Sequence, residues 1–344
     1  MSTEALPGCR TAAEVLAGTR TRVEPALRTA VDGLSEPLRH VAGYHLGWWD
    51  ERGSPTRAGG KALRPALVLL AAEAVGGDPE RAVPAAVAVE LVHNSTLLHD
   101  DVIDGDAERR HRATAWAVFG EAAAILAGDA LMARALELLA SPGDPLAGRA
   151  VRLLGGATQD VLGGQSADVS FESRGDVGVG ECVTMAQAKT SALLRVACEL
   201  GALYGGAAPE RAARLAGFGG ELGLAFQHVD DLLGIWGDPA ATGKPVHSDL
   251  FSRKKTLPVV AALAAETAAG RELSALYGGD GPLTQEEAVR AAELIDRAGG
   301  RAWSGRQADD LVARARNALA AAGPEPRAAA ELDALARLVT DRDH

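Results

Sequence analysis

The sequence predicts an all-α protein that folds as one large helical bundle. Hydrophobic residues make up 47% of the 344 residues and aromatic residues only 4%, and alanine, leucine and valine dominate the apolar set. Alanine and leucine are among the residues that cost least in a helix, so this composition favours helices over strands. Apolar residues also recur with helical spacing almost throughout, and no strand-like alternation bounded by hairpin turns is found.

Two long apolar segments are the clearest predicted helices. Residues 84–104 begin with a proline, which suits the first turn of a helix, and they stay apolar nearly all round until the last turn. Residues 215–236 have the same character. A helix that is apolar on every face is expected inside a bundle, so both segments are predicted to be buried.

Stretches rich in glycine and proline separate the predicted helices, at residues 52–60, 141–147, 204–209 and 277–285. None of them is long or polar enough to link two domains. We therefore expect a single domain over residues 1–344, in which residues 1–19 form a loosely ordered or peripheral segment.

Charge and cysteine content restrict the class of protein. A formal net charge of −11 and a pI near 5.3 argue against a general surface for nucleic acid or anionic membranes. Cys9, Cys182 and Cys198 are scattered without metal-ligand spacing, which indicates reduced thiols. The N-terminus lacks a signal-peptide pattern, and no apolar run reaches the roughly 18 residues of a membrane span. A cytoplasmic enzyme is expected.

Adjacent aspartates occur near the end of both apolar segments. In HDDVIDGDAERRHR, residues 99–112, Asp100 and Asp104 lie within about 40° of each other on a helix, and Asp101 flanks them. His93 falls on the same face two turns earlier.

In FQHVDDLLGIWGD, residues 226–238, Gln227, Asp230 and Asp231 form a second stripe at positions i, i+3 and i+4. Two such stripes facing each other would repel, so cations are expected between them. Carboxylate oxygens suit Mg²⁺, which commonly bridges carboxylates to substrate phosphates. Helix caps or solvated loops explain most single aspartate pairs, but not two pairs that each end an apolar helix. A calcium loop is excluded because Val102 and His111 stand at its third and twelfth positions.

Basic residues close to these motifs could hold an anion beside the metal ions. The candidates are Lys61 and Arg64 in GGKALRP, Arg109 and Arg110 after the first acidic motif, and Lys244 and Lys254 in TGKPVHSDLFSRKKTLP. Lysine and arginine usually serve surface solvation, but each of these lies beside an acidic motif or a glycine turn. A lysine and an arginine three residues apart on a helix can grip a diphosphate together.

The ordered motifs resemble those of the all-trans polyprenyl diphosphate synthases, which make farnesyl, geranylgeranyl and longer diphosphates. The resemblance runs from about residue 20 to the C-terminus. It rests on GGKALRP, ELVHNSTLLHDDVIDGDAERR, GGQSAD, AKTSALL and FQHVDDLLGIWGDPAATGKPVHSDLFSRKKTLP. The stretches GYHLGWWD and DDLLGIWGDP are most similar to the actinobacterial branch that resembles geranylgeranyl diphosphate synthase.

This resemblance implies an isoprenoid synthase fold with a central cavity, usually in a homodimer. The implied reaction condenses isopentenyl diphosphate with dimethylallyl, geranyl or farnesyl diphosphate. Three Mg²⁺ ions are implied, two on Asp100, Asp101 and Asp104 and one on Asp230 and Asp231. Arg109, Lys189 and Lys244 match contacts of the allylic diphosphate, with Lys254 nearby, and Lys61, Arg64, His93 and Arg110 match the isopentenyl diphosphate site. Thr190 and Gln227 match residues near the developing cation, and Gln165 and Asp168 match a polar pair on the neighbouring helix.

The chain departs from the family pattern at several positions. Gly234 stands where many relatives have a third aspartate, and His111 and Ala113 replace glycine and proline in the usual RRGxPT, so this loop is expected to be less rigid. Ser191 and Arg195 replace small or apolar residues, and Arg195 would place a charge close to the reaction centre, which the sequence does not explain.

Ser95 and Thr96 are small where relatives often carry aromatic residues that floor the elongation cavity. A small floor admits a longer product, so geranylgeranyl diphosphate or a longer chain is expected, unless a bulky side chain from another helix closes the cavity.

Two other functions stay open at this point. A class I terpene cyclase would keep the magnesium motifs but has no need of an isopentenyl site, which this chain retains. A non-catalytic subunit or cargo-like binding protein would be expected to lose an aspartate motif or the basic clusters, and both are present here.

Overall fold

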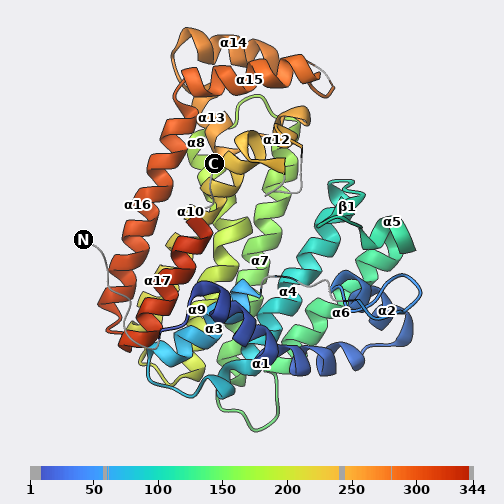
Figure 1. The fold of residues 1–344 in the computed structure, drawn as a ribbon, viewed down its shortest axis with the longest axis vertical. Helices are drawn as coiled ribbons and strands as arrows, with labels where there is room; N and C mark the ends of the chain where they lie inside the picture. The colour runs from blue at the N-terminus through green and yellow to red at the C-terminus, as the bar shows by residue number, and fades with distance from the viewer. Residues whose placement is uncertain (1–8, 57–59, 61, 240–244, 280, 341–344) are drawn as a thin grey trace. The chain divides into compact units, whose positions relative to one another are not determined.

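The fold is all-α, as the composition and helical spacing predict (Figure 1). The computed structural model describes residues 9–56, 60, 62–239, 245–279 and 281–340. The apolar segments 84–104 and 215–236 lie in helices α4 (Val83–Ile103) and α10 (Pro209–Trp236). In α4, Pro84 stands in the first turn as expected, and most side chains from Ala85 to Val92 have no exposed surface.

Contacts group the chain into two compact units. Unit 1 comprises residues 1–158, 196–216 and 319–335, and unit 2 comprises residues 159–195, 217–318 and 336–344. The boundaries fall inside helices α7 (Ala147–Glu172), α9 (Ala192–Tyr204), α10, α16 (Gly300–Ala321) and α17 (Pro326–Thr340). The single domain over residues 1–344 stays a prediction.

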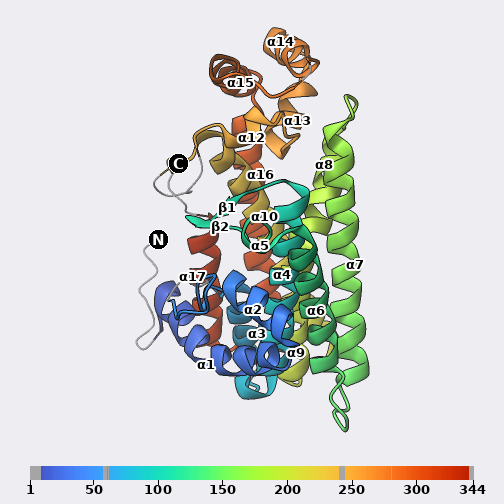
Figure 2. The same cartoon turned by 90° about the vertical axis from the view of Figure 1, so that its right-hand side faces the viewer.

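Unit 1 is built around α4, which packs along α6 (Figures 1 and 2). Its other helices are α1 (Ala12–Asp32), α2 (Glu36–His45), α3 (Leu63–Ala74), a short 3₁₀ turn η1 (Pro79–Ala82), α5 (Ala115–Phe119) and α6 (Glu121–Leu139). Helix α1 begins with a capping box, in which Thr11 Oγ1 accepts from the backbone of Glu14 and Glu14 accepts from the backbone of Thr11. Residues 12–19 of the expected peripheral segment are therefore helical.

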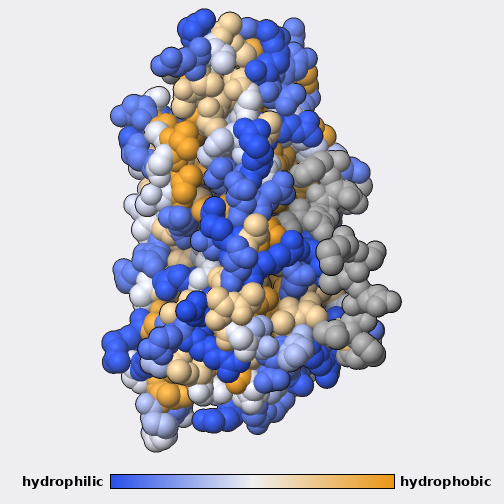
Figure 3. Space-filling model, turned by 90° about the vertical axis from the view of Figure 1, so that its left-hand side faces the viewer, coloured by the Kyte–Doolittle hydropathy of each residue, from blue (hydrophilic) through white to orange (hydrophobic). Residues whose placement is uncertain are grey.

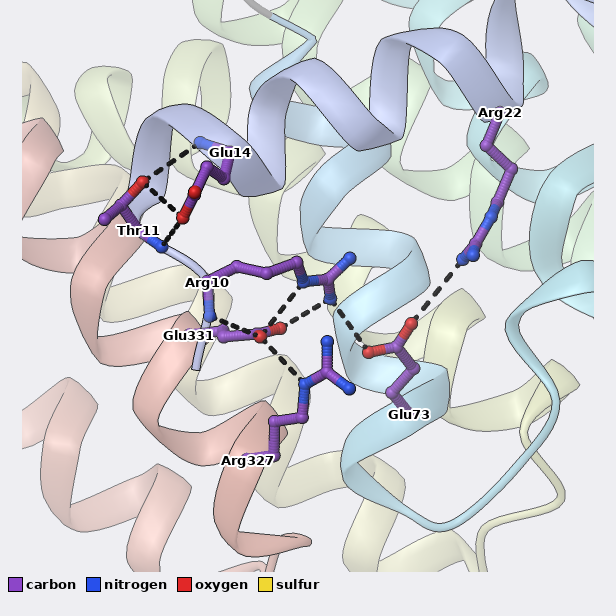
Figure 4. A network of polar contacts seen from close by, with 7 residues as sticks. All are labelled: Arg10, Thr11, Glu14, Arg22, Glu73, Arg327 and Glu331. Carbon is purple, nitrogen blue, oxygen red and sulfur yellow. Dashed lines mark hydrogen bonds and ion pairs between the residues drawn. The ribbon is translucent and has the colours of Figure 1, made fainter. Parts of the chain in front are cut away.

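A network of ion pairs holds Arg10, two residues before α1, inside unit 1 (Figure 4). Arg10 pairs with Glu331 of α17 and with Glu73 of α3, and Glu331 also accepts a hydrogen bond from Arg327. The Glu331 side chain has no exposed surface. The network thus connects segments from both ends of the chain.

A hairpin joins α4 to α5 in a region where no strands were expected. Strands β1 (Glu108–Arg109) and β2 (Arg112–Ala113) pair antiparallel, and both turn residues, Arg110 and His111, have positive φ angles of 52° and 60°. Positive φ at both positions is the type I′ arrangement, which favours asparagine and glycine. Strands of two residues are too short to show alternation, and the turn lacks its usual residues, so the sequence carries no hairpin signal.

Unit 2 contains shorter helices together with parts of the long ones. These are α8 (Val179–Ala186), a π-helical turn η2 (Gln187–Ser191), α12 (Ser248–Phe251), α13 (Leu257–Leu263), α14 (Ala268–Tyr277) and α15 (Gln285–Arg297). Helices α14 and α15 pack as a pair (Figure 2). One core cluster connects them to α10, α12 and α13, and includes Ile235, Leu250, Val259, Leu273, Leu294 and Ile295.

The surface is mixed in character. On the face drawn in Figure 3, hydrophobic residues lie in small groups among hydrophilic ones. Among the described residues, no helix is both long and apolar enough to cross a membrane.

Candidate active site

The first acidic motif lies at the C-terminal end of α4 in unit 1. The helix ends at Ile103, and the N–H of its C-cap Asp104 donates to the carbonyl of Asp100 at 2.8 Å. Asp104 is exposed, Asp100 is partly buried and Asp101 is buried. The break after Ile103 therefore presents the three aspartates in three different environments.

Asp101 is held by the hairpin and keeps one unused oxygen. Arg109 Nε donates to Asp101 Oδ1 at 2.6 Å, while Asp101 Oδ2 is buried without a hydrogen-bond partner. Burial raises the pKa of Asp101, and the charge of Arg109 offsets part of that rise. An orphaned carboxylate oxygen that faces no protein donor is a suitable ligand for a cation.

Arg64 and His93, both predicted for the isopentenyl site, meet in unit 1. Arg64 Nη1 donates to His93 Nε2 at 3.0 Å, and Arg64 Nε is buried with no partner. Burial, followed by the charge of Arg64, lowers the pKa of His93 well below its ordinary value, so the ring is neutral and accepts this bond. Burial also lowers the pKa of Arg64 to about 10, which still leaves the guanidinium charged at neutral pH. The unpaired Nε is therefore a donor available to an anion.

Sequence reasoning missed three residues around this pair. Asn94 Nδ2 donates to the carbonyl of Glu90 at 2.8 Å and to its Oε1 at 3.2 Å. Burial raises the pKa of Glu90, and the charge of Arg64 offsets part of that rise. His45 lies near Asn94 and Arg109. Glu90 could have been found from the sequence, because it is a lone glutamate in the apolar run 84–104. No sequence feature marked His45 as a candidate.

A cavity of about 320 Å³ in unit 1 adjoins the first motif. Its lining combines charged and apolar residues, namely Tyr44, His45, Leu46, Gly47, Leu97, Asp101, Arg109, Arg110, Arg112, Ala113, Thr114 and Ala115. Asp101, Arg109 and Arg110 are thus brought to one hollow, as their sequence proximity suggested.

Ser95 and Thr96 are both buried in α4. Their hydroxyls donate to the carbonyls of Val92 at 2.9 Å and of His93 at 2.8 Å, one turn earlier in the same helix. Both side chains are therefore satisfied within their own helix and present only their small apolar atoms to their surroundings.

The second acidic motif lies in the part of α10 that belongs to unit 2. Asp230 is exposed, whereas Asp231 is buried. Gln227 Nε2 donates to Asp231 Oδ1 at 2.7 Å, and the backbone N–H of Leu257, the first residue of α13, donates to Oδ2 at 2.8 Å. Thr190 Oγ1 in turn donates to Gln227 Oε1 at 2.5 Å. Asp231 therefore fixes the predicted cation-facing pair Thr190 and Gln227.

Lys189 and Asp168 form an ion pair in unit 2, with Lys189 Nζ 2.6 Å from Asp168 Oδ2. A side chain on Gly164 could not fit there, because its Cβ would lie 2.4 Å from the Lys189 backbone nitrogen. Gly164 of GGQSAD thus allows α7 to approach the π-helical turn that carries Lys189 and Thr190. The next residue, Gln165, is buried, and neither of its amide atoms has a partner.

Of the remaining basic candidates, Lys254 is described by the structure, whereas Lys61 and Lys244 are not. Lys254 is partly buried, and its charge lowers the pKa of Asp231. The adjacent Lys255 instead donates to the carbonyls of Phe171 at 2.6 Å and Glu172 at 3.3 Å, at the end of α7.

The structure shows the surroundings of Arg195 and Ser191. The Arg195 side chain is 43% exposed, and it pairs with Asp160 Oδ2 at 3.4 Å. Ser191 is buried and donates to the carbonyl of Gly220 at 2.5 Å, where α10 passes closely enough that a Cβ on Gly223 would clash with it. Both departures are explained by packing and surface charge.

The donor chemistry fits Mg²⁺ shared with a phosphate ligand. Within the described part of the chain, no three histidine, cysteine, aspartate or glutamate side chains converge closely enough to hold a metal ion by themselves. Paired carboxylates with an orphaned oxygen at Asp101 match the few protein ligands that Mg²⁺ takes when phosphate supplies the others.

Comparison with known proteins decides the family. A model of the polyprenyl synthetase family matches residues 54–295. The chain belongs to the polyprenyl synthetase family. Relatives of this family member include the (2E,6E)-farnesyl diphosphate synthase of Mycobacterium tuberculosis, 49% identical over 324 residues, which cover 93% of this chain and 90% of the relative. The geranylgeranyl diphosphate synthase of the same organism is 46% identical over 331 residues, covering 96% and 93%.

Solved structures agree with this membership. The crystal structure of polyprenyl synthetase from Streptomyces coelicolor A3(2) matches with a TM-score of 0.90 and 50% identity, covering 94% of this chain and 98% of that one. This chain is therefore a prenyltransferase with the all-α isoprenoid synthase fold, as the resemblance implied. The cyclase alternative finds no support among these relatives.

Proposed function

We propose that this prenyltransferase condenses isopentenyl diphosphate with dimethylallyl, geranyl or farnesyl diphosphate to give all-trans geranylgeranyl diphosphate or a longer chain. The length of the product is inferred from Ser95 and Thr96, which are small and are buried in α4 just before the first aspartates. Because both hydroxyls bond back to their own helix, no bulky or polar group projects from these positions to stop a growing chain.

The acidic residues take the metal-binding roles in this proposal. Asp100, Asp101 and Asp104 would hold two Mg²⁺ ions and Asp230 and Asp231 a third. Bound magnesium would neutralise the allylic diphosphate and make it a better leaving group. The proposal is supported by Asp101 Oδ2, which is buried without a hydrogen-bond partner, and by the burial of Asp231, which raises its pKa to about 7.

The basic residues bind the two diphosphates. Arg109, Lys189 and Lys244 would contact the allylic diphosphate with Lys254 close by, and Lys61, Arg64, His93 and Arg110 would hold isopentenyl diphosphate. The unpaired Nε of Arg64 supports this role, since a buried guanidinium donor calls for an acceptor. Neutral His93 accepts a hydrogen bond from Arg64 and so orients its guanidinium.

The reaction follows from these roles. The carbon–oxygen bond of the allylic diphosphate breaks and leaves an allylic cation near Thr190 and Gln227, whose mutual hydrogen bond fixes their oxygen dipoles. The double bond of isopentenyl diphosphate attacks the cation and forms the new carbon–carbon bond. A proton then passes to the departing diphosphate, so no side-chain base is needed.

Product analysis tests the proposal. Purified protein with Mg²⁺, isopentenyl diphosphate and each allylic primer should yield linear diphosphates of geranylgeranyl length or longer, identified by mass spectrometry. Thr96→Phe should shorten the product, and Thr96→Val is the matched control that keeps the side chain small. Farnesyl diphosphate as the end product of the unaltered protein would contradict the proposed chain length, and no linear product from any primer would contradict the proposed reaction.

A homodimer and a cytoplasmic location complete the proposal. Two apolar side chains stand exposed on α6, Ile125 at 42% and Leu126 at 55%, and a second copy of the chain would cover them. Leu126→Glu should shift the protein to monomer in size-exclusion chromatography with light scattering, whereas Val289→Glu at an exposed position of α15 should not. The location is supported by the free thiols of Cys9, Cys182 and Cys198.

A further inference from the structure

The hairpin that carries Arg109 and Arg110 has a backbone that its own residues do not favour. Both turn residues, Arg110 and His111, have positive φ angles, 52° and 60°, a region that disfavours residues with a side chain. Glycine at position 111 would suit that conformation, and proline at position 113, as in RRGxPT, would fix the φ of β2. Since this chain has neither residue, contacts from outside the hairpin must hold its shape.

Arg112 makes such contacts with the end of α2 and the residues that follow it. Its Nη1 donates to the carbonyl of Tyr44 at 3.2 Å, and its Nη2 donates to the carbonyl of Trp49 at 3.2 Å. The guanidinium carbon also lies 4.5 Å from the centre of the Tyr44 ring, which is a cation–π contact. One planar group is thus engaged at its edge and on its face, and a lysine could not reproduce this combination.

Tyr44 holds the next residue of β2 as well. Its hydroxyl donates to the carbonyl of Ala113 at 2.8 Å, and only 5% of Tyr44 is exposed. The ring also packs edge-to-face with Phe119, at 5.1 Å between ring centres. Strand β2 is therefore attached to Tyr44 at two consecutive residues, Arg112 and Ala113.

The segment that receives Arg112 is itself fixed in place. Trp49 Nε1 donates to the carbonyl of His40 in α2 at 2.9 Å. A Cβ on Gly43 would lie 2.0 Å from Cζ2 of Trp49, so the indole packs directly on the backbone of α2. The carbonyls of Tyr44 and Trp49 are thus held at a constant spacing that matches the two arms of one guanidinium.

The position of the hairpin decides where its two other arginines lie. Arg109 Nε donates to Asp101 Oδ1 at 2.6 Å. A Cβ on Gly60 would lie 3.2 Å from Arg110 Nη1, so that guanidinium lies against the glycine turn that leads to Arg64. A hairpin detached from α2 would carry both arginines away from these neighbours.

We propose that Arg112 and Tyr44 are positioning residues, which hold the hairpin so that Arg109 and Arg110 bind the two diphosphates. They act on the substrates only through these two arginines. This inference rests on the proposed function, which assigns Arg109 to the allylic diphosphate and Arg110 to isopentenyl diphosphate. The two positioning residues replace the restraint that glycine and proline would give to the same turn.

Two variants remove the attachment to different extents. Arg112→Ala deletes both hydrogen bonds and the cation–π contact, whereas Tyr44→Phe deletes only the hydroxyl and keeps the ring. Arg28→Ala is the matched control, because Arg28 also lies over an aromatic ring of this segment, 4.4 Å from the centre of Trp48. Its hydrogen bonds go to Glu24 of its own helix instead of the hairpin.

A rescue variant restores the restraint by other means. His111→Gly and Ala113→Pro are introduced together into Arg112→Ala. Proline is compatible with position 113 because the N–H of Thr114 donates to the carbonyl of Ala107 at 3.0 Å. Hydrogen-bonded and non-hydrogen-bonded pairs alternate along an antiparallel ladder, so the N–H of the preceding residue is not needed for pairing.

Steady-state kinetics should show a loss of binding rather than of chemistry. Arg112→Ala should lower kcat/KM for both diphosphates by about 10- to 100-fold through higher KM values, with kcat within about threefold of the unaltered protein. Tyr44→Phe should raise both KM values by about fivefold, the effect of one hydrogen bond. The rescue variant should return to within about threefold of the unaltered protein, and Arg28→Ala should leave both KM values unchanged.

Trypsin cleavage after Arg109 or Arg110, mapped by mass spectrometry, reports on the hairpin without substrate or turnover. Arg112→Ala should be cleaved there about 10-fold faster, because cleavage follows the population in which the hairpin is detached. The rescue variant should be cleaved as slowly as the unaltered protein, and so should Arg28→Ala.

The outcomes separate this inference from the proposed function. Unchanged KM values and unchanged cleavage in Arg112→Ala would overturn it, as would equal losses in Arg28→Ala or a rescue variant no better than Arg112→Ala. If circular dichroism shows Arg112→Ala to be unfolded, Tyr44→Phe decides, and unchanged KM values there would overturn the inference. An unaltered protein that forms no linear diphosphate would instead contradict the proposed function, while the trypsin assay would still test the attachment of the hairpin.

Discussion

Replacing Glu331 with alanine is expected to destabilise unit 1 more than any other single change in the network of Figure 4. Glu331 accepts from Arg10 through its backbone nitrogen at 3.1 Å, Nε at 3.0 Å and Nη2 at 2.5 Å, and from Arg327 Nε at 3.1 Å. Burial would raise the pKa of Glu331, but these hydrogen bonds outweigh it and leave the pKa below its ordinary value. The carboxylate is therefore ionised at neutral pH.

The expected magnitude follows from how much of each partner is exposed. Removing one member of a buried ion pair costs about 3–5 kcal/mol, because the other charge stays buried and unpaired. The Arg10 side chain is 27% exposed and keeps Glu73, so solvent and the second carboxylate reduce the loss to about 2–3 kcal/mol. For a chain of this length such a loss lowers the melting temperature by about 3–4 °C.

Thermal unfolding followed by circular dichroism measures this change, and limited proteolysis before α1 reports whether the Arg10 segment is released. Arg327→Ala is the control, because Arg327 is 61% exposed and its loss should cost no more than about 1 kcal/mol. Equal effects of Glu331→Ala and Arg327→Ala, or no faster cleavage near Arg10, would refute the reasoning.

Three further predictions concern single side chains. His111→Gly should stabilise the protein by about 1 kcal/mol, because glycine adopts the φ of 60° at no cost, and chemical denaturation should show Ala113→Gly to be destabilising instead. Burial, followed by the charges of Arg109 and Arg110, lowers the pKa of His45 from 6.5 to about 3, so stability should fall as the pH drops below about 6.5. His45→Gln should reduce this loss in melting curves at pH 7.5 and pH 5.5. Arg195→Ala should cost less than about 0.5 kcal/mol and leave turnover unchanged.

Each of these has an outcome that would count against it. A destabilised His111→Gly protein would mean that the imidazole makes contacts worth more than the backbone strain. An identical pH dependence in His45→Gln would assign the acid sensitivity to other groups, such as His93. A tenfold or larger loss of turnover in Arg195→Ala would return Arg195 to the reaction centre.

Local sequence features predicted the helices and most of the candidate residues. Segment 84–104 became α4 with a shift of one residue, because an apolar run with proline in its first turn specifies a helix without help from the rest of the chain. The pairing of Arg109 with Asp101 was also within reach, since only eight residues separate them. Segment 215–236 began earlier than expected, at Pro209, because its first turns carry charged residues that an apolar pattern does not reveal.

Contacts between residues distant in sequence could not be read in this way. No feature of the sequence near Asp231 predicts that its Oδ2 accepts a hydrogen bond from the backbone N–H of Leu257, 26 residues later. Likewise, no feature near Gly234 predicts that the carboxylate of Asp249 lies against it. The exposure of Arg195 was equally hidden, because a charged residue in an apolar helix is consistent with either a site or a surface.

The sequence by itself determined the fold class, the helices and the two acidic motifs, because helical periodicity and motif spacing are properties of neighbouring residues. Only the tertiary structure decided how individual side chains are used. Asp231 accepts hydrogen bonds from Gln227 and Leu257, Ser191 forms a contact between helices, and Asp249 lies against Gly234. Packing and burial, rather than spacing along the chain, determine which of these groups meet.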